Sequence, residues 1–101
     1  MKLKRLVTKT AMREIAAIND YLLSSLKSPQ AAANFRTELK HQMNLICESP
    51  ELFHISRIPE LALFNFRSVM VNNYVMVFLV TDDSVVVEHI FHSKQDYGKC
   101  I

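Results

Sequence analysis

The spacing of apolar and polar residues predicts a strand and a helix at the start of the chain. Residues 2–8 alternate in character, as a short strand does. From Thr8 or Thr10, either of which can cap a helix with its hydroxyl, apolar residues recur at intervals of four, three and four. These residues are Ala11, Ile15, Ile18 and Leu22. The pattern therefore predicts an amphipathic helix that ends near Leu26.

A second helix is predicted between Ser28 and Pro50. Ser28 is a good N-cap, and Pro29 fits the first helical position because its missing amide is not needed there. Pro50 ends the helix, since a residue before proline avoids helical geometry. The side chains expected to face the core are Ala32, Phe35, Leu39, Met43 and Ile46. Because the connection near Lys27 is short, the two helices should be antiparallel neighbours.

Strands are predicted for the last third of the chain. Residues 51–65 have no clean period and read as a loop or an irregular strand. Apolar strands then follow at residues 65–71, 74–80 and 85–92, separated by Asn72-Asn73 and by the Asp-Asp-Ser of residues 82–84, which suit tight turns. The fold class is therefore α+β: an N-terminal strand and an antiparallel two-helix hairpin packed on an antiparallel sheet with a three-stranded C-terminal meander. We expect one domain spanning residues 1–101.

The middle strand of the meander is apolar on both faces. One face carries Tyr74, Met76, Phe78 and Val80, and the other carries Val75, Val77 and Leu79. Two helices cover only one side of a sheet. The other side is either covered by residues 51–65 or available to a partner. We favour the partner, because large exposed apolar patches tend to be interaction sites.

Composition excludes several classes of protein. A single glycine rules out the glycine-rich loops that cradle phosphates, and a net charge of +2 does not by itself indicate nucleic-acid binding. Cys47 and Cys100 lack the spacing of a zinc site or a disulfide framework, so we interpret them as reduced thiols. No apolar stretch approaches the roughly 20 residues of a membrane span. We therefore expect a cytoplasmic protein without membrane contact or cofactor.

The histidines do not predict a metal centre. In a regular last strand, Val86, Glu88, Ile90 and His92 would lie on one face, and Val85, Val87, His89 and Phe91 on the other. His89 and His92 would then point to opposite sides of the sheet and could not share an ion. We therefore expect no metal ligands.

A candidate site lies where the last strand ends, in "FHSKQDY" at residues 91–97. Metal-free RNA cleavage needs a cation for the charge on the scissile phosphate and groups that move protons. The candidates for these catalytic roles are Arg67, His92, Lys94 and Tyr97. Arg67 joins them if it lies across the sheet from the end of the third meander strand. The alternatives are an edge-strand charge at Arg67 that discourages aggregation, and a turn cap at Asp96.

Several segments together resemble the RelE/ParE superfamily of type II toxin-antitoxin toxins over nearly the full length. They are "VTKTAMREIAAINDYL", "SPQAAANFRTEL", the "SP" that ends the second helix, "FRSVMVNNYVMVFLV" and "VVVEHIFHSKQDY". The most telling positions are Ala11, Arg67, Tyr74, His92, Lys94 and Asp96. The resemblance implies a growth-arresting toxin, encoded beside a cognate antitoxin that folds across it. A toxin-antitoxin heterotetramer would be in keeping with this.

The resemblance implies two kinds of target. One branch of the superfamily contains ribosome-dependent endoribonucleases that cut messenger RNA, and another poisons DNA gyrase without being a nuclease. Arg67, Lys94 and His92 or Tyr97 occupy positions comparable to those of the nuclease branch. The modest charge, and a lysine where a second arginine is expected, favour a gyrase-type target. A metal-independent nuclease and a non-toxic partner-binding domain are the alternatives, so whether the chain is an enzyme stays open.

Overall fold

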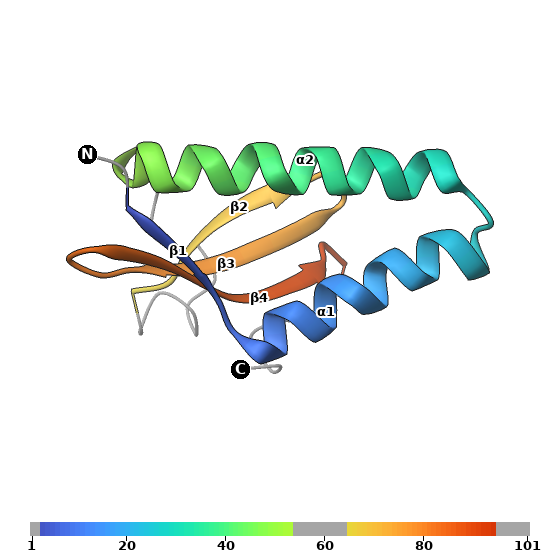
Figure 1. Cartoon of the computed structure of the whole chain (residues 1–101), viewed down its shortest axis with the longest axis horizontal. Helices are drawn as coiled ribbons and strands as arrows, with labels where there is room; N and C mark the ends of the chain where they lie inside the picture. The colour runs from blue at the N-terminus through green and yellow to red at the C-terminus, as the bar shows by residue number, and fades with distance from the viewer. Residues whose placement is uncertain (1–2, 54–64, 95–101) are drawn as a thin grey trace.

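The computed structural model describes residues 3–53 and 65–94, and it contains a two-helix hairpin and one sheet (Figure 1). Most of the segment expected to be irregular, residues 54–64, lies outside the described residues, as do residues 95–101. The elements in chain order are β1 (Lys4–Val7), α1 (Lys9–Asp20), the π-helical turn η1 (Tyr21–Ser25), α2 (Pro29–Glu48), the 3₁₀ turn η2 (Pro50–Leu52), β2 (Arg67–Val71), β3 (Tyr74–Val80) and β4 (Ser84–His92).

Both helices begin at the residues that the sequence predicts. Thr8 caps α1 by accepting a hydrogen bond from the Ala11 amide at 3.0 Å. Ser28 caps α2 by accepting one from the Ala31 amide at 3.1 Å. All five side chains predicted to form the apolar stripe of α2 are buried. The chain stays helical through Ser25, which confirms a first helix ending near Leu26 and adds a π-helical last turn.

The two helices form an antiparallel hairpin whose connected ends extend past the sheet (Figure 1). Arg36 on α2 donates a hydrogen bond of 2.8 Å to the Asn19 side chain on α1, which ties the two helices together near this end. Three large apolar side chains are substantially exposed there: Tyr21, Leu23 and Leu26. The hairpin is therefore anchored to the sheet at one end only and presents apolar side chains at the other.

The sheet has the strand order β1-β4-β3-β2. β2, β3 and β4 form the predicted antiparallel meander, and Asn72 adopts the left-handed backbone (φ 53°) that its tight turn requires. β1 pairs in parallel with β4 at the opposite edge, so the complete sheet is mixed. The observed order of strand, helix hairpin and meander confirms the predicted α+β class.

Both faces of the sheet are buried in the single chain. On the face that carries Met76 and Phe78, which we call the helix face, α1 and α2 complete the main core. On the second face, Phe66, Val75, Val77 and Phe91 form a separate cluster, and each is at most 7% exposed. The hypothesis that the second face waits open for a partner is therefore wrong for the residues at its centre.

A β-bulge in β4 changes which of its side chains share a face. Val77 pairs with His89 and Phe78 with Val87, so Glu88 is an extra residue on β4. Before the bulge Val85 and Val87 face the helices, and after it Ile90 does so. The strictly alternating pattern expected for this strand is therefore wrong, because one inserted residue reverses the alternation. The prediction that His89 and His92 point to opposite sides holds, because both lie beyond the bulge and are three positions apart, an odd number.

Candidate functional site

The sheet register separates the candidate residues into two groups. Arg67 at the start of β2 pairs with Phe78, whereas His92 at the end of β4 pairs with Tyr74. Three residues of β3 therefore lie between these two partners, an offset of four residue steps or roughly 14 Å along the strand at about 3.4 Å per residue. The expectation that Arg67 lies across the sheet from the end of the third meander strand is wrong. The first and third strands of a meander run in the same direction, so their starting ends lie together.

Arg67 is engaged in holding the fold. Its Nη1 donates a hydrogen bond to the backbone carbonyl of Phe53, just after η2. The Phe53 ring packs edge-on against Phe78, with 6.0 Å between ring centroids, and Phe78 is the cross-strand partner of Arg67. Arg67 thus ties the chain that follows α2 to the edge strand β2. This contact agrees better with a structural role at the sheet edge than with a guanidinium free to bind phosphate.

His92 and Lys94 do lie together. The Lys94 amide donates a hydrogen bond of 3.2 Å to Nδ1 of His92. The His92 ring packs edge-on against Tyr74 at 5.4 Å, and Tyr74 packs in turn against Phe35 at 5.3 Å. Tyr97 and Asp96 lie outside the described residues. Of the four residues predicted to be catalytic, the structure therefore places two side by side, at the end of β4, and their catalytic role stays a prediction.

A groove of about 940 Å³ lies between α1 and the end of β4, and we call it the edge groove. One wall is formed by Thr10, Glu14, Ala17 and Tyr21, which recur every three or four residues and so share one side of the helical segment α1–η1. The opposite wall is formed by His89 to His92 and by the Asn72-Asn73 turn. Ile18, Leu22 and Phe35 add apolar side chains to the lining. Grooves of this size and character bind partners or ligands.

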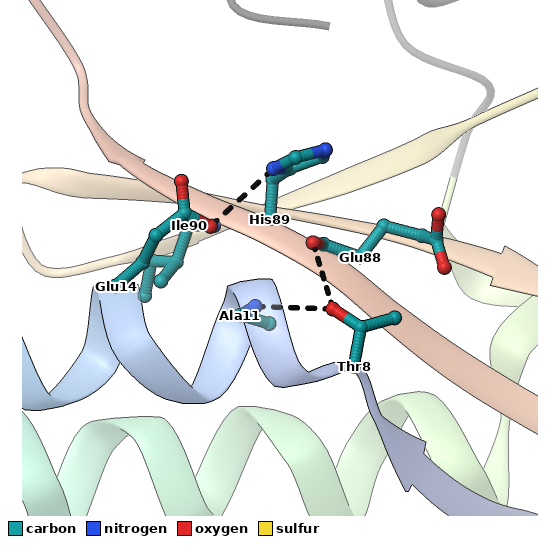
Figure 2. Close-up of polar contacts among 6 residues, drawn as sticks. All are labelled: Thr8, Ala11, Glu14, Glu88, His89 and Ile90. Atoms are coloured by element: carbon teal, nitrogen blue, oxygen red, sulfur yellow. Dashed lines mark hydrogen bonds and ion pairs between the residues drawn. The ribbon is translucent and has the colours of Figure 1, made fainter.

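Glu14 is a lining residue that the sequence did not single out. Its carboxylate accepts a hydrogen bond of 3.1 Å from the Ile90 amide and lies 3.4 Å from Nδ1 of His89 (Figure 2). The His89 ring stacks on Phe91 with 5.2 Å between centroids. Nothing in the spacing of α1 distinguishes Glu14 from an ordinary solvent-facing carboxylate. Its role depends on how α1 crosses β4, which is a tertiary feature.

Tyr74 is a titratable residue of the groove whose pKa is raised in the folded chain. Burial, with the neighbouring Tyr21 as the second cause, raises the pKa of the Tyr74 phenol above its ordinary value of 10.0. Both causes disfavour the phenolate. The groove is thus lined by a neutral tyrosine at physiological pH.

The raised pKa of Tyr74 predicts a loss of stability at alkaline pH. Above pH 10.0 the unfolded chain releases the Tyr74 proton while the folded chain still holds it, so the free energy of unfolding falls as pH rises through the folded pKa. Below pH 10.0 the contribution is fully present. We expect Tyr74→Phe to flatten this decline and the exposed Tyr21→Phe to retain most of it. Urea unfolding measured between pH 8 and 11 would check this, and parallel declines for all three chains would contradict it.

Within residues 3–53 and 65–94, no group of three or more histidine, cysteine or acidic side chains is arranged to hold a metal ion. No helix in the same residues is long and apolar enough to cross a membrane. Cys47 is buried on α2, and Cys100 lies outside the described residues. The side chains that line the edge groove offer aromatic, hydroxyl, amide, imidazole and carboxylate groups.

Comparisons with known proteins agree with the fold. Residues 6–97 match the family model of the ParE toxin of the type II toxin-antitoxin system parDE. A solved structure titled as the chromosomal ParDE toxin-antitoxin system from P. aeruginosa superposes with a TM-score of 0.70 at 16% identity, covering 90% of this chain and 96% of that one. Comparison with curated proteins gives no significant match. Since the family model spans nearly the whole sequence, the chain belongs to the ParE toxin family of type II toxin-antitoxin systems.

Proposed function

We propose that this chain is a toxin that arrests growth by binding DNA gyrase, without cutting RNA, and that a cognate antitoxin neutralises it. The observation that carries the proposal is the separation of Arg67 from His92 and Lys94 along β3. A phosphate-cleaving site needs its cation and its proton-transfer groups within reach of one phosphodiester. Roughly 14 Å along a strand, at about 3.4 Å per residue, is too far for that.

The electrostatics of the sheet support the same proposal. The centre of the second face is the apolar cluster of Phe66, Val75, Val77 and Phe91, and the centre of the helix face is core. Neither offers the cationic surface that docking onto ribosomal RNA requires. With a net charge of +2 for the whole chain, a protein target is favoured over a nucleic-acid target.

An antitoxin partner follows from family membership and from the edge groove. The related structure is titled as a toxin-antitoxin system, and the groove between α1 and β4 leaves Tyr21 half exposed. Apolar side chains in an open groove are typical of a surface that another polypeptide covers. We therefore assign neutralisation to a partner that occupies this groove, in a complex that can include two copies of each chain.

Induction of the chain in cells without its antitoxin tests the proposed target. We expect growth arrest accompanied by DNA breaks covalently linked to gyrase, with messenger RNA on ribosomes left intact. Messages cut in the ribosomal A site, without gyrase-linked breaks, would instead support the alternative, an mRNA endoribonuclease. Unaffected growth, with the antitoxin still bound, would indicate a partner-binding domain that is not toxic.

Arg67→Ala separates the two toxin mechanisms. The substitution removes the hydrogen bond to the Phe53 carbonyl and should cost about 1–2 kcal/mol of folding stability. If the chain acts by binding gyrase, growth arrest should persist at a temperature where the variant is folded. Circular dichroism would establish folding, and Arg13→Ala, at an exposed position on α1, is the control. A folded Arg67→Ala chain that no longer arrests growth, beside an active control, would count against the proposal.

A further inference from the structure

Strand β4 continues beyond the end of its neighbour β1. β1 pairs with β4 only from Ser84 to Val87, and the last backbone hydrogen bond on this side joins the Thr8 amide to the Val87 carbonyl at 3.1 Å. Beyond that point the chain turns into α1. Among the described residues, no strand pairs with this side of β4 from Glu88 to Ile90.

Two side chains take the place of the missing strand. The Thr8 hydroxyl donates a hydrogen bond of 3.1 Å to the Glu88 carbonyl, and the Glu14 carboxylate accepts one from the Ile90 amide (Figure 2). In a sheet these backbone groups would pair with an adjacent strand. A side chain that occupies the amide of an edge strand discourages unspecific pairing with other chains. The backbone of the edge strand nevertheless keeps the extended conformation in which another strand can pair with it.

The edge groove runs along this part of β4. The Ile90 amide points toward Glu14, which lies on the opposite wall. The backbone carbonyls of a helix already accept hydrogen bonds within the helix, so a bound helix would not pair with the Ile90 amide. An extended chain has unpaired backbone carbonyls, and one of them can accept a hydrogen bond from this amide. The backbone of β4 therefore favours an extended occupant over a helical one.

We propose that the edge groove receives an extended segment of the antitoxin, which pairs with β4 at Ile90 and displaces the Glu14 carboxylate from its amide. This inference rests on the proposed function, because it assigns a binding mode to that same partner. Main-chain hydrogen bonds give affinity in such strand addition, and alternate side chains give specificity. The segment should therefore carry apolar residues at every second position, to pack on Ile18, Tyr21 and Leu26.

Charge further defines the segment. Glu14 contributes the carboxylate among the side chains that line the groove, and in the free chain it lies 3.4 Å from Nδ1 of His89. A displaced carboxylate at a partly buried site is best compensated by a cation. We therefore expect a lysine or arginine of the antitoxin segment to lie against Glu14.

Nuclear magnetic resonance on the full toxin-antitoxin complex tests the pairing directly. With ¹⁵N in the toxin and ¹³C in the antitoxin, a scalar coupling across the hydrogen bond should join the Ile90 nitrogen to an antitoxin backbone carbonyl. A complex in which the Ile90 amide still pairs with Glu14, or in which a helix fills the groove, overturns this inference alone. Absence of any complex would overturn the proposed partner as well, so the two failures are distinguishable.

Glu14→Gln tests the expected cation. Glutamine keeps an oxygen that can accept from the Ile90 amide in the free chain but lacks the negative charge. We expect antitoxin affinity to fall about two- to fivefold, the range of a partly exposed ion pair, and to depend less on salt. Glu48→Gln, at an exposed position on α2, is the matched control and should leave affinity unchanged. Equal affinities and equal salt dependence for the two variants would overturn the assignment of a cation to Glu14.

Discussion

Replacing Val77 by aspartate is expected to unfold the chain. Val77 is fully buried at the centre of the second face of the sheet, among Phe66, Val75 and Phe91. An isolated carboxylate placed there must lose its hydration without gaining a partner, at a cost of several kcal/mol, which is a large part of the roughly 5–15 kcal/mol that stabilises a domain. Circular dichroism during thermal unfolding would show loss of the cooperative transition, or a transition lowered by tens of degrees.

Leu6→Asp is the matched control for this prediction. Leu6 is on β1, where it pairs with Val86 of β4 and lies on the same face of the sheet as Val77. Half of the Leu6 surface is exposed. The same charge at this edge keeps most of its hydration and should change the unfolding temperature by only a few degrees, as surface substitutions of about 0.5 kcal/mol do. If Val77→Asp were as stable as Leu6→Asp, the centre of the second face would be open to solvent.

Phe35→Ala should produce a loss of similar size on the helix face. Phe35 is 1% exposed on α2 and packs edge-on against Tyr74, which in turn contacts His92. Truncating a buried phenylalanine typically costs about 3–5 kcal/mol, through lost burial and the cavity that remains. Because Phe35 also lines the edge groove, the variant should bind the antitoxin less tightly even where it is folded.

Urea unfolding of Phe35→Ala and Phe35→Leu would measure this cost. The leucine variant keeps most of the buried volume and should lose less than about 1.5 kcal/mol. A loss in Phe35→Ala no larger than in Phe35→Leu would mean that the volume buried at this position does not anchor α2 to the sheet.

The helices and strands were predictable because their signals are local. Thr8 and Ser28 cap helices through hydroxyls that accept hydrogen bonds from amides three residues away. The apolar residues of α2 recur with the period of a helix, and the side of the helix that they mark is the buried one. The Asn72-Asn73 turn is equally local. Such features depend on nearby residues and on backbone preferences, so they can be predicted without knowledge of the tertiary structure.

The site was less predictable because its features depend on register. β4 mixes apolar and polar residues on both faces and shows no clean alternation, so the bulge at Glu88 could not be seen in the sequence. The position of Arg67 was different. An antiparallel meander places the starts of its first and third strands together, and this rule alone would have separated Arg67 from His92.

The measurement that most directly tests a gyrase-binding toxin uses purified components. The chain is incubated with DNA gyrase and supercoiled plasmid, and in parallel with ribosomes carrying messenger RNA. If the chain is a gyrase-binding toxin, linear DNA covalently bound to gyrase accumulates while the messenger RNA stays whole. Untouched plasmid together with messenger RNA cut in the ribosomal A site would contradict it.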